Sequence, residues 1–143
     1  RHHIDLLSRI YTYFFTIFTR PIEYRNLSGA SWVVIGAALT TLIFNEKTAI
    51  IGLLVLSLAD SAAAIIGLKF GKTYLFNKSL EGSAAFFIVA FLIVFYLSPA
   101  FFLINLIAVS AATAVELFST ARMNDNLFIP LVTAFILTLG GVT

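Results

Sequence analysis

The strongest constraint on the fold is a series of long apolar runs that are almost free of charge. A first run covers residues 6–19. Five more follow, separated by short polar segments, at residues 29–44, 48–68, 82–97, 100–120 and 127–143. Because a helix needs about 20 mainly apolar residues to cross a bilayer, the runs predict an all-α, polytopic membrane helix bundle with about five transmembrane helices.

The composition supports this prediction. Hydrophobic residues make up 60% of the 143 residues and charged residues only 11%, whereas a soluble domain has roughly 25% charged residues. The net charge of +2 is more typical of membrane topology than of nucleic-acid binding. We therefore expect an integral, multi-pass membrane protein with membrane lipids around it and no nucleic-acid partner.

The first run, residues 6–19, is short for a membrane span and rich in aromatic residues. It predicts an N-terminal interfacial helix, or the truncated end of a longer one. Arg20 and Pro21 end this run, and a polar segment continues to residue 28. We therefore expect an N-terminal segment over residues 1–28 and a transmembrane bundle that carries the site over residues 29–143.

The positive charges predict an orientation. If the runs cross the membrane in turn, the polar segments 20–28, 69–81 and 122–126 share one face, and Lys47 lies on the other. The shared face carries most of the lysines and arginines, which places it in the cytoplasm. A basic loop needed for function would produce the same asymmetry.

Asp60 is the first unusual residue, because it lies well inside an apolar run. Asp60, Ala63, Ala64, Gly67 and Gly71 follow helical spacing and form one stripe of small residues with the acid at its inner end. A carboxylate at the membrane centre costs about 2.5–3.5 kcal/mol on insertion scales. The stripe is either a helix-packing seam with one paired acid, or the wall of a polar entrance that leads to a metal-binding carboxylate.

Glu116 is the second intramembrane acid, near the same face of the predicted bundle. It could extend to the membrane interface without further function. Two acids on two helices at one face also suit a divalent cation that is shared with phosphate groups.

The polar loop over residues 69–81 precedes a helix. Lys78 can bind a phosphate as a point charge, and Ser79, Gly82 and Ser83 stand where the next helix begins. The free backbone N–H groups of a helix start favour an anion. The alternative interpretation is topology-determining charge together with an N-cap formed by Ser79.

Asp125 and Asn126 precede the last apolar run. As Asp and Asn are favoured N-cap residues, helix capping is the default interpretation. A metal ion or a ribose hydroxyl is the alternative ligand.

Taken in order, these segments resemble the polyprenol kinase family, which comprises dolichol kinases, phytol kinases and CTP-dependent diacylglycerol kinases and is related to the phosphatidate cytidylyltransferases. The resemblance covers residue 20 to the end. It rests on the stretch from Asp60 to Gly71, on Lys78-Ser79-Leu80-Glu81-Gly82-Ser83, on Glu116, and on the stretch from Asp125 to Pro130.

The resemblance implies an enzyme that transfers the γ-phosphate of CTP to an isoprenoid alcohol or diacylglycerol with Mg²⁺ (or Mn²⁺). It implies catalytic carboxylates at Asp60 and Glu116, and metal ligands at Asp60, Glu116 and Asp125. The nucleotide-binding residues that it implies are Gly67, Gly71, Lys72, Lys78, Ser79, Glu81, Gly82, Ser83 and Asn126. Asp60 or Glu116 would orient or deprotonate the acceptor hydroxyl.

Two alternatives stay open at this point. One is cytidylyl transfer from CTP to a phospholipid, which would use the same nucleotide-binding face. The other is an inactive or non-enzymatic membrane bundle. If such a bundle were transporter-like, we would expect inverted repeats or broken helices near the middle of the membrane. A homodimer is compatible with each of these hypotheses.

Overall fold

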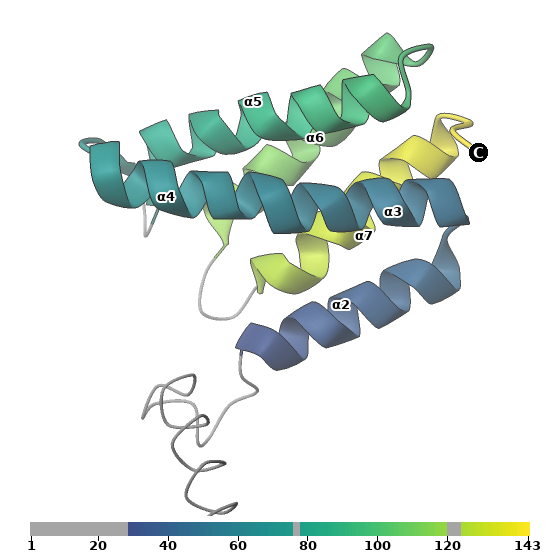
Figure 1. Ribbon diagram of the computed structural model, residues 1–143, viewed down its shortest axis with the longest axis horizontal. Coiled ribbons are helices and arrows are strands. Elements are labelled where there is room, and N and C mark those ends of the chain that lie inside the picture. Colours follow the sequence, from purple (N-terminus) through teal and green to yellow (C-terminus); the bar gives the residue numbers. More distant parts are fainter. Residues whose placement is uncertain (1–28, 76–77, 120–123) are drawn as a thin grey trace, which may run out of the picture.

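The computed structural model describes residues 29–75, 78–119 and 124–143, which form a helical bundle (Figure 1). In chain order the elements are α2 (Gly29–Ile43), α3 (Glu46–Leu54), the π-helical turn η2 (Val55–Ala59), α4 (Asp60–Phe70), β1 (Tyr74–Leu75), β2 (Lys78–Ser79), α5 (Leu80–Leu97), α6 (Phe102–Phe118) and α7 (Asp125–Leu139). The predicted all-α bundle is confirmed, and each of the five apolar runs after residue 28 forms helix. The predicted N-terminal helix and polar segment lie outside the described residues.

The continuous helix α3-η2-α4 is central to the arrangement. Figure 1 shows it running between α2 and α5, with α6 and α7 behind it. Helix α7 packs against α2, α3 and α6, whereas α5 packs against α4, η2 and α6. The core between these helices is apolar and includes the fully buried side chains of Val55, Phe86, Ala108, Ile129 and Leu137.

The outer surface of the bundle is also apolar. Leu42, Leu68 and Leu103 are 82%, 90% and 70% exposed, and they are three of many large hydrophobic side chains that face outward. A soluble monomer rarely exposes so much contiguous apolar surface, and a bilayer would cover it. The surface is therefore consistent with a membrane protein.

Two helices are long and apolar enough to cross a membrane, namely Glu46–Phe70 with 25 residues and Leu80–Leu97 with 18. The other apolar helices among the described residues, α2, α6 and α7, have 15 to 17 residues. Length alone thus identifies two spans, and the expected five crossings stay a prediction.

The polar loop before α5 contains a feature that the sequence did not predict. Strands β1 and β2 pair antiparallel, with Tyr74 opposite Ser79 and Leu75 opposite Lys78. The short hairpin ends at the start of α5, where the Ser79 hydroxyl accepts a hydrogen bond from the Gly82 N–H at 3.1 Å. The N-cap that was the alternative interpretation for Ser79 is therefore present.

The start of α7 differs from the prediction. Its N-cap is Asn124, whose side chain makes no capping hydrogen bond, and Asp125 is the first helical residue. Asp125 Oδ1 does accept a hydrogen bond from the Asn126 N–H at 3.0 Å. The default interpretation of Asp125 and Asn126 as N-caps is therefore wrong, because both are helical residues and Asn124 takes the N-cap position.

Helices α4 and α5 approach each other closely at Gly67, in the small-residue stripe of α4, and at Gly82, in the first turn of α5. A Cβ atom added at Gly67 would lie 2.8 Å from Ser79 Oγ, and one added at Gly82 would lie 2.8 Å from the Ala63 carbonyl oxygen. Both distances are shorter than van der Waals contact, so neither position has room for a side chain. The close approach brings the start of α5 against the face of α4 that carries Asp60.

We expect Gly82→Ala to destabilise the bundle by about 1–3 kcal/mol, the usual cost of overpacking, because α4 and α5 must move apart. Gly29→Ala is the matched control, since its added Cβ would meet only Asn126 Nδ2, at an ordinary 3.8 Å. The free energy of unfolding can be measured by SDS titration in mixed micelles. Equal stability of the two variants would contradict the close packing.

Candidate functional site

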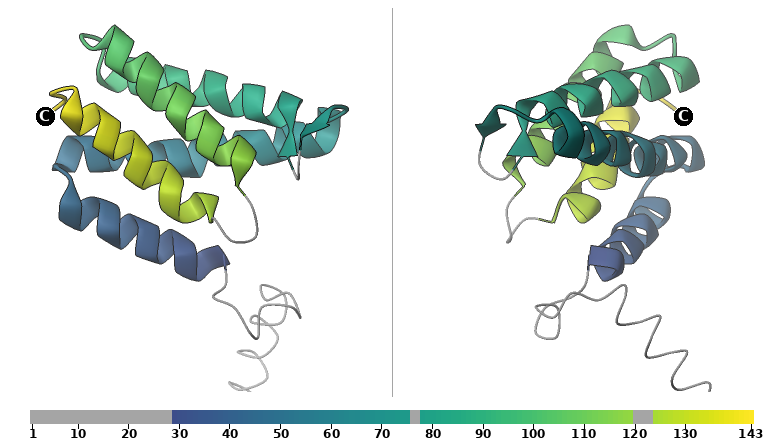
Figure 2. Two further views of the ribbon diagram at one scale, coloured as in Figure 1. Left: turned by 180° about the vertical axis from the view of Figure 1, so that it is seen from behind. Right: turned by 60° about the vertical axis from the view of Figure 1, so that its left-hand side comes forward.

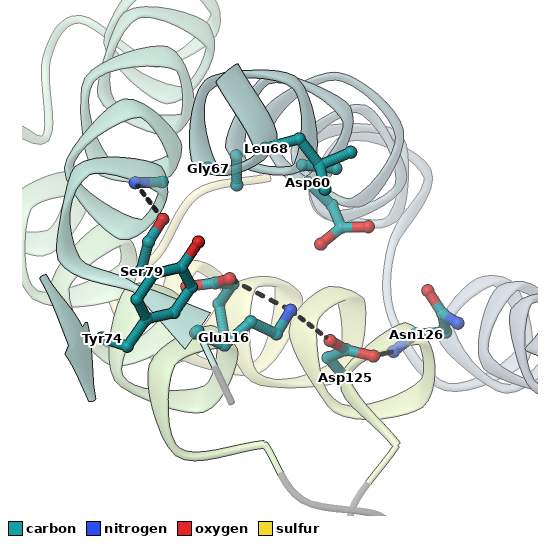
Figure 3. A pocket seen from close by; sticks show the side chains of 12 residues that line it. Asp60, Gly67, Leu68, Tyr74, Ser79, Glu116, Asp125 and Asn126 are labelled. Atoms are coloured by element: carbon teal, nitrogen blue, oxygen red, sulfur yellow. Dashed lines mark hydrogen bonds and ion pairs between the residues drawn. The ribbon is translucent and has the colours of Figure 1, made fainter. Parts of the chain in front are cut away.

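A polar pocket of about 370 Å³ opens between α4, the hairpin, α6 and the start of α7. Its size falls in the range of about 300–1,000 Å³ that is typical of small-molecule sites. The lining residues are Asp60, Ala63, Ala64, Gly67, Leu68, Tyr74, Lys78, Ser79, Gly82, Glu116, Asp125 and Asn126 (Figure 3). Four segments that lie far apart in the sequence therefore contribute to one cavity.

The pocket lies toward one end of the bundle. Figure 2 shows the hairpin and the start of α7 on the side away from the C-terminus. At the C-terminal end, Lys47 Nζ donates a hydrogen bond to the Thr143 carbonyl oxygen at 3.2 Å. The segments 69–81 and 124–126 thus share one end and Lys47 lies at the other, as expected for alternating helices. Arg20, Arg25 and Arg122 lie outside the described residues, and the cytoplasmic orientation stays a prediction.

Lys78 joins the walls of the pocket. Its Nζ lies 3.0 Å from Glu116 Oε1 and 2.9 Å from Asp125 Oδ2. Glu116 is only 2% exposed, and its Oε2 accepts a hydrogen bond from the Ser83 hydroxyl at 2.7 Å. Asp125 Oδ2 also accepts one from the Ser119 hydroxyl at 3.1 Å. The lysine therefore links β2 to α6 and α7 through charge-assisted hydrogen bonds, which are among the strongest in proteins.

The environment of Lys78 favours its charged form. Burial by itself lowers the pKa of the ammonium group, but the hydrogen bond to Asp125 and the charges of Asp125 and Glu116 outweigh it and leave the pKa above its ordinary value. The stabilisation from these pairs is thus fully present at neutral pH. The contribution of the lysine charge is lost as the pH rises through its raised pKa.

Asp60 has a different environment from the other two acids. Figure 3 shows its carboxylate pointing from α4 into the pocket, across from Glu116 and Asp125. Within the described residues it makes no hydrogen bond and no ion pair. Asp60 is therefore the acidic side chain of this pocket whose oxygens are available to a ligand.

The charges of the pocket do not balance. Three carboxylates and one ammonium group line it, which leaves a net formal charge of −2. A phosphate group that enters such a cavity is repelled unless a cation accompanies it. The basic residues of the loop alone do not make this site attractive to an anion.

Four predicted site residues do not line the pocket. Ser83 is buried and hydrogen-bonds Glu116, so it supports a wall of the pocket. Gly71 lies against Ser79, where an added Cβ would be 2.9 Å from the serine Cβ. Lys72 is exposed, and the Glu81 carboxylate accepts a hydrogen bond from the Thr73 N–H at 3.2 Å. The roles in nucleotide binding that the resemblance implies for these residues stay predictions.

The pocket also contains residues that the sequence did not single out. Tyr74, on β1, is 63% exposed and has its ring at the mouth of the cavity (Figure 3). Leu68 extends the lining of α4 beyond the stripe of small residues. An aromatic residue inside a polar, cation-rich loop was the signal that could have identified Tyr74.

The donor set suits a hard divalent cation only in part. Carboxylate and amide oxygens are the ligands that Mg²⁺ prefers. However, no group of three or more acidic or histidine side chains in residues 29–75, 78–119 and 124–143 is arranged to hold a metal ion. Mg²⁺ in nucleotide sites is commonly held by one or two carboxylates together with phosphate oxygens. The residues therefore fit a cation that arrives with a nucleotide rather than one that the protein alone retains.

Comparison with curated proteins gives relatives that cover different shares of the chain. The uncharacterized protein RP860 of Rickettsia prowazekii is 36% identical over 140 residues, which is 92% of this chain and 69% of the relative. The CTP-dependent diacylglycerol kinase 1 of Saccharomyces cerevisiae is 29% identical over 116 residues. The dolichol kinase sec59 of Schizosaccharomyces pombe is 37% identical over 89 residues.

The two named kinases are distant and partial relatives. The aligned region is 71% of this chain and 40% of the diacylglycerol kinase, and 57% of this chain and 18% of the dolichol kinase. No family model matches the chain, and no solved structure matches it.

Proposed function

The chain belongs to the same family as the uncharacterized protein RP860 of Rickettsia prowazekii, and from its likeness to two lipid kinases we propose that it is a lipid kinase of the polyprenol kinase family. In this proposal it transfers the γ-phosphate of CTP to the hydroxyl of an isoprenoid alcohol or diacylglycerol. The reaction takes place at the cytoplasmic face of a multi-pass membrane bundle.

The pocket carries this proposal. Asp60, Lys78, Glu116 and Asp125 come from the four separate segments that resemble the family, and all four line one cavity. A packing seam at Asp60, a Glu116 that only extends to the membrane interface, topology-determining charge at Lys78 and a helix cap at Asp125 would give no reason for such a convergence. Phosphoryl transfer depends mainly on positioning and on electrostatic stabilisation, which a cluster of fixed charges provides.

The geometry favours Asp60 over Glu116 as the residue that contacts the acceptor hydroxyl. Both oxygens of Glu116 are already engaged, by Lys78 and by Ser83, whereas the Asp60 carboxylate faces the cavity. The hydroxyl donates its proton to Asp60 while its oxygen forms a bond to the γ-phosphorus. The bond between the γ-phosphorus and the bridging oxygen then breaks, and CDP leaves with that oxygen.

The cation has a limited part in this scheme. Asp125, whose Oδ1 accepts only the Asn126 N–H within the described residues, and the Asn126 side chain would hold it beside the phosphates. When bound, Mg²⁺ (or Mn²⁺) supplies positive charge that offsets the net charge of −2 of the pocket. Lys78 keeps Glu116 and Asp125 in place on the opposite wall.

Tyr74 is positioned to stack on the nucleotide base. Stacking of a base on an aromatic side chain contributes about 1–3 kcal/mol by alanine substitution, so we expect Tyr74→Ala to weaken CTP binding about tenfold and Tyr74→Phe to preserve it. Tyr96→Ala, on the exposed end of α5, is the control. Equilibrium binding of CTP to the purified variants measures the effect, and unchanged affinity of Tyr74→Ala would remove the residue from the site.

The proposed reaction is tested by reconstituting the full chain in liposomes with γ-labelled or α-labelled CTP in parallel. Farnesol, phytol, a longer polyprenol, diacylglycerol and phosphatidate serve as acceptors. Label that passes to lipid from the γ position alone supports the kinase. Transfer from the α position would instead support the cytidylyltransferase alternative, and no transfer from either position would contradict the proposed enzyme.

A further inference from the structure

A second cavity borders the first one at Asp60. It has a volume of about 510 Å³ and is lined by Val33, Leu53, Leu56, Ser57, Asp60, Ser61 and Asn126. It lies between α2, the central helix and the start of α7, each of which contributes lining residues. Asp60 and Asn126 line both cavities, so the two spaces meet at the available carboxylate.

The second cavity differs from the first in its charge. Val33, Leu53 and Leu56 provide apolar walls. Its two serine hydroxyls already donate to the backbone of their own helix, Ser57 to the Leu54 carbonyl oxygen at 3.3 Å and Ser61 to the Ser57 carbonyl oxygen at 2.6 Å. Among the described residues that line this cavity, Asp60 is the sole ionisable one, and none is a lysine or arginine that would attract a phosphate.

The helix geometry is irregular at this same place. The π-helical turn η2 (Val55–Ala59) contributes Leu56 and Ser57 to the cavity and ends directly before Asp60. A π-turn adds one residue to the helical repeat and occurs frequently at functional sites. The irregular turn therefore lies within the part of the central helix that lines the cavity.

We infer that the second cavity binds the hydrocarbon chain of the acceptor alcohol next to its hydroxyl, which lies against Asp60. This inference rests on the proposed kinase function and adds the place of the lipid. The nucleotide then occupies the polar pocket, the lipid occupies the second cavity along Val33, Leu53 and Leu56, and the reacting oxygen lies at their junction.

Two other apolar cavities fit this role less well. One is lined by Leu92, Ile93, Phe95, Tyr96 and Pro99 and contains no carboxylate. The other, beside Lys47 and Thr143, lies at the opposite end of the bundle from the polar pocket. Neither shares a lining residue with the polar pocket, so an alcohol bound there could not reach the nucleotide.

The inference is tested by photo-crosslinking the full chain in phosphatidylcholine vesicles with a farnesol derivative that carries a diazirine. We expect saturable labelling of the segment 53–61. Unlabelled farnesol should compete with this labelling, whereas the methyl ether of farnesol should not. Ser57→Phe fills the cavity from an exposed position, and it should reduce this labelling about tenfold. Leu58→Phe is the matched control, since Leu58 is exposed and does not line the cavity.

The labelling needs no phosphate donor, so its outcome is independent of the kinase reaction. Saturable labelling of residues 53–61 without any transfer from CTP would contradict the proposed function and support an alcohol site. Three results, if transfer from CTP is observed, would overturn the lipid site and leave the kinase function standing. The first is labelling that maps outside residues 53–61, and the second is labelling that unlabelled farnesol does not compete away. The third is equal labelling of the Ser57→Phe and Leu58→Phe variants.

Discussion

Replacing Asp60 with asparagine is expected to reduce γ-phosphate transfer by about 10²–10⁴-fold, the usual contribution of a positioned proton acceptor. An amide has nearly the same shape but cannot take the proton of the acceptor hydroxyl. Because Asp60 makes no hydrogen bond or ion pair within the described residues, and because the exchange removes a costly charge from an apolar run, the variant should be at least as stable as the wild type. Steady-state transfer rates and SDS titration measure the two quantities.

Two further variants make the Asp60 result specific. Glu46→Gln is a matched exchange of carboxylate for amide at the opposite end of the bundle, where Glu46 is exposed, and it should leave activity and stability unchanged. Asp125→Asn should lower both, because Asp125 is paired with Lys78. An Asp60→Asn variant with more than a third of the wild-type rate would exclude Asp60 from the chemistry.

The second large effect is expected at Lys78. Lys78→Met leaves the carboxylate of Glu116, which is 2% exposed, with only the Ser83 hydroxyl as a partner. Breaking a buried ion pair costs about 3–5 kcal/mol, and we expect about 3 kcal/mol because the lysine side chain itself is 28% exposed. Activity should be lost as well, since the walls of the pocket are no longer held together.

A double variant separates these two effects of Lys78. Lys78→Met combined with Glu116→Gln removes the unpaired buried charge, so it should recover most of the lost stability without recovering the activity. Lys69→Met, in the last turn of α4, is the control, because Lys69 lies over the ring of Phe70 and not in the pocket. If Lys78→Met were as stable as Lys69→Met, the ion pairs would not support the fold.

The helices and the acidic residues of the site were predictable from local patterns. The apolar runs marked the helices because apolar length is a property of the sequence itself. Asp60 and Glu116 attracted attention because a carboxylate within an apolar run is costly. The spacing of Ala63, Ala64 and Gly67 behind Asp60 correctly indicated a face that another element approaches closely, and the structure places it beside the start of α5.

The features that were not predicted depend on contacts between distant segments. The π-turn before Asp60 has no glycine or proline to mark it. Lys78 was interpreted as an isolated phosphate-binding charge, and its pairing with Glu116 and Asp125 became visible only when the hairpin, α6 and α7 were placed together. The second cavity could not be predicted either, because its lining comes from α2, the central helix and α7.

The central claim is that the polar pocket binds a nucleotide with its cation, and the lack of cysteine in the chain permits a direct test. Ala64→Cys places a single thiol in the pocket, and Lys47→Cys places one at the opposite end. We predict that CTP with Mg²⁺ slows the reaction of maleimide with the Ala64→Cys variant about tenfold or more. CTP with EDTA should leave this reaction rate unchanged. Neither mixture should change the reaction rate of the Lys47→Cys variant. A labelling rate at Ala64→Cys that saturating CTP and Mg²⁺ leave unchanged would contradict the account.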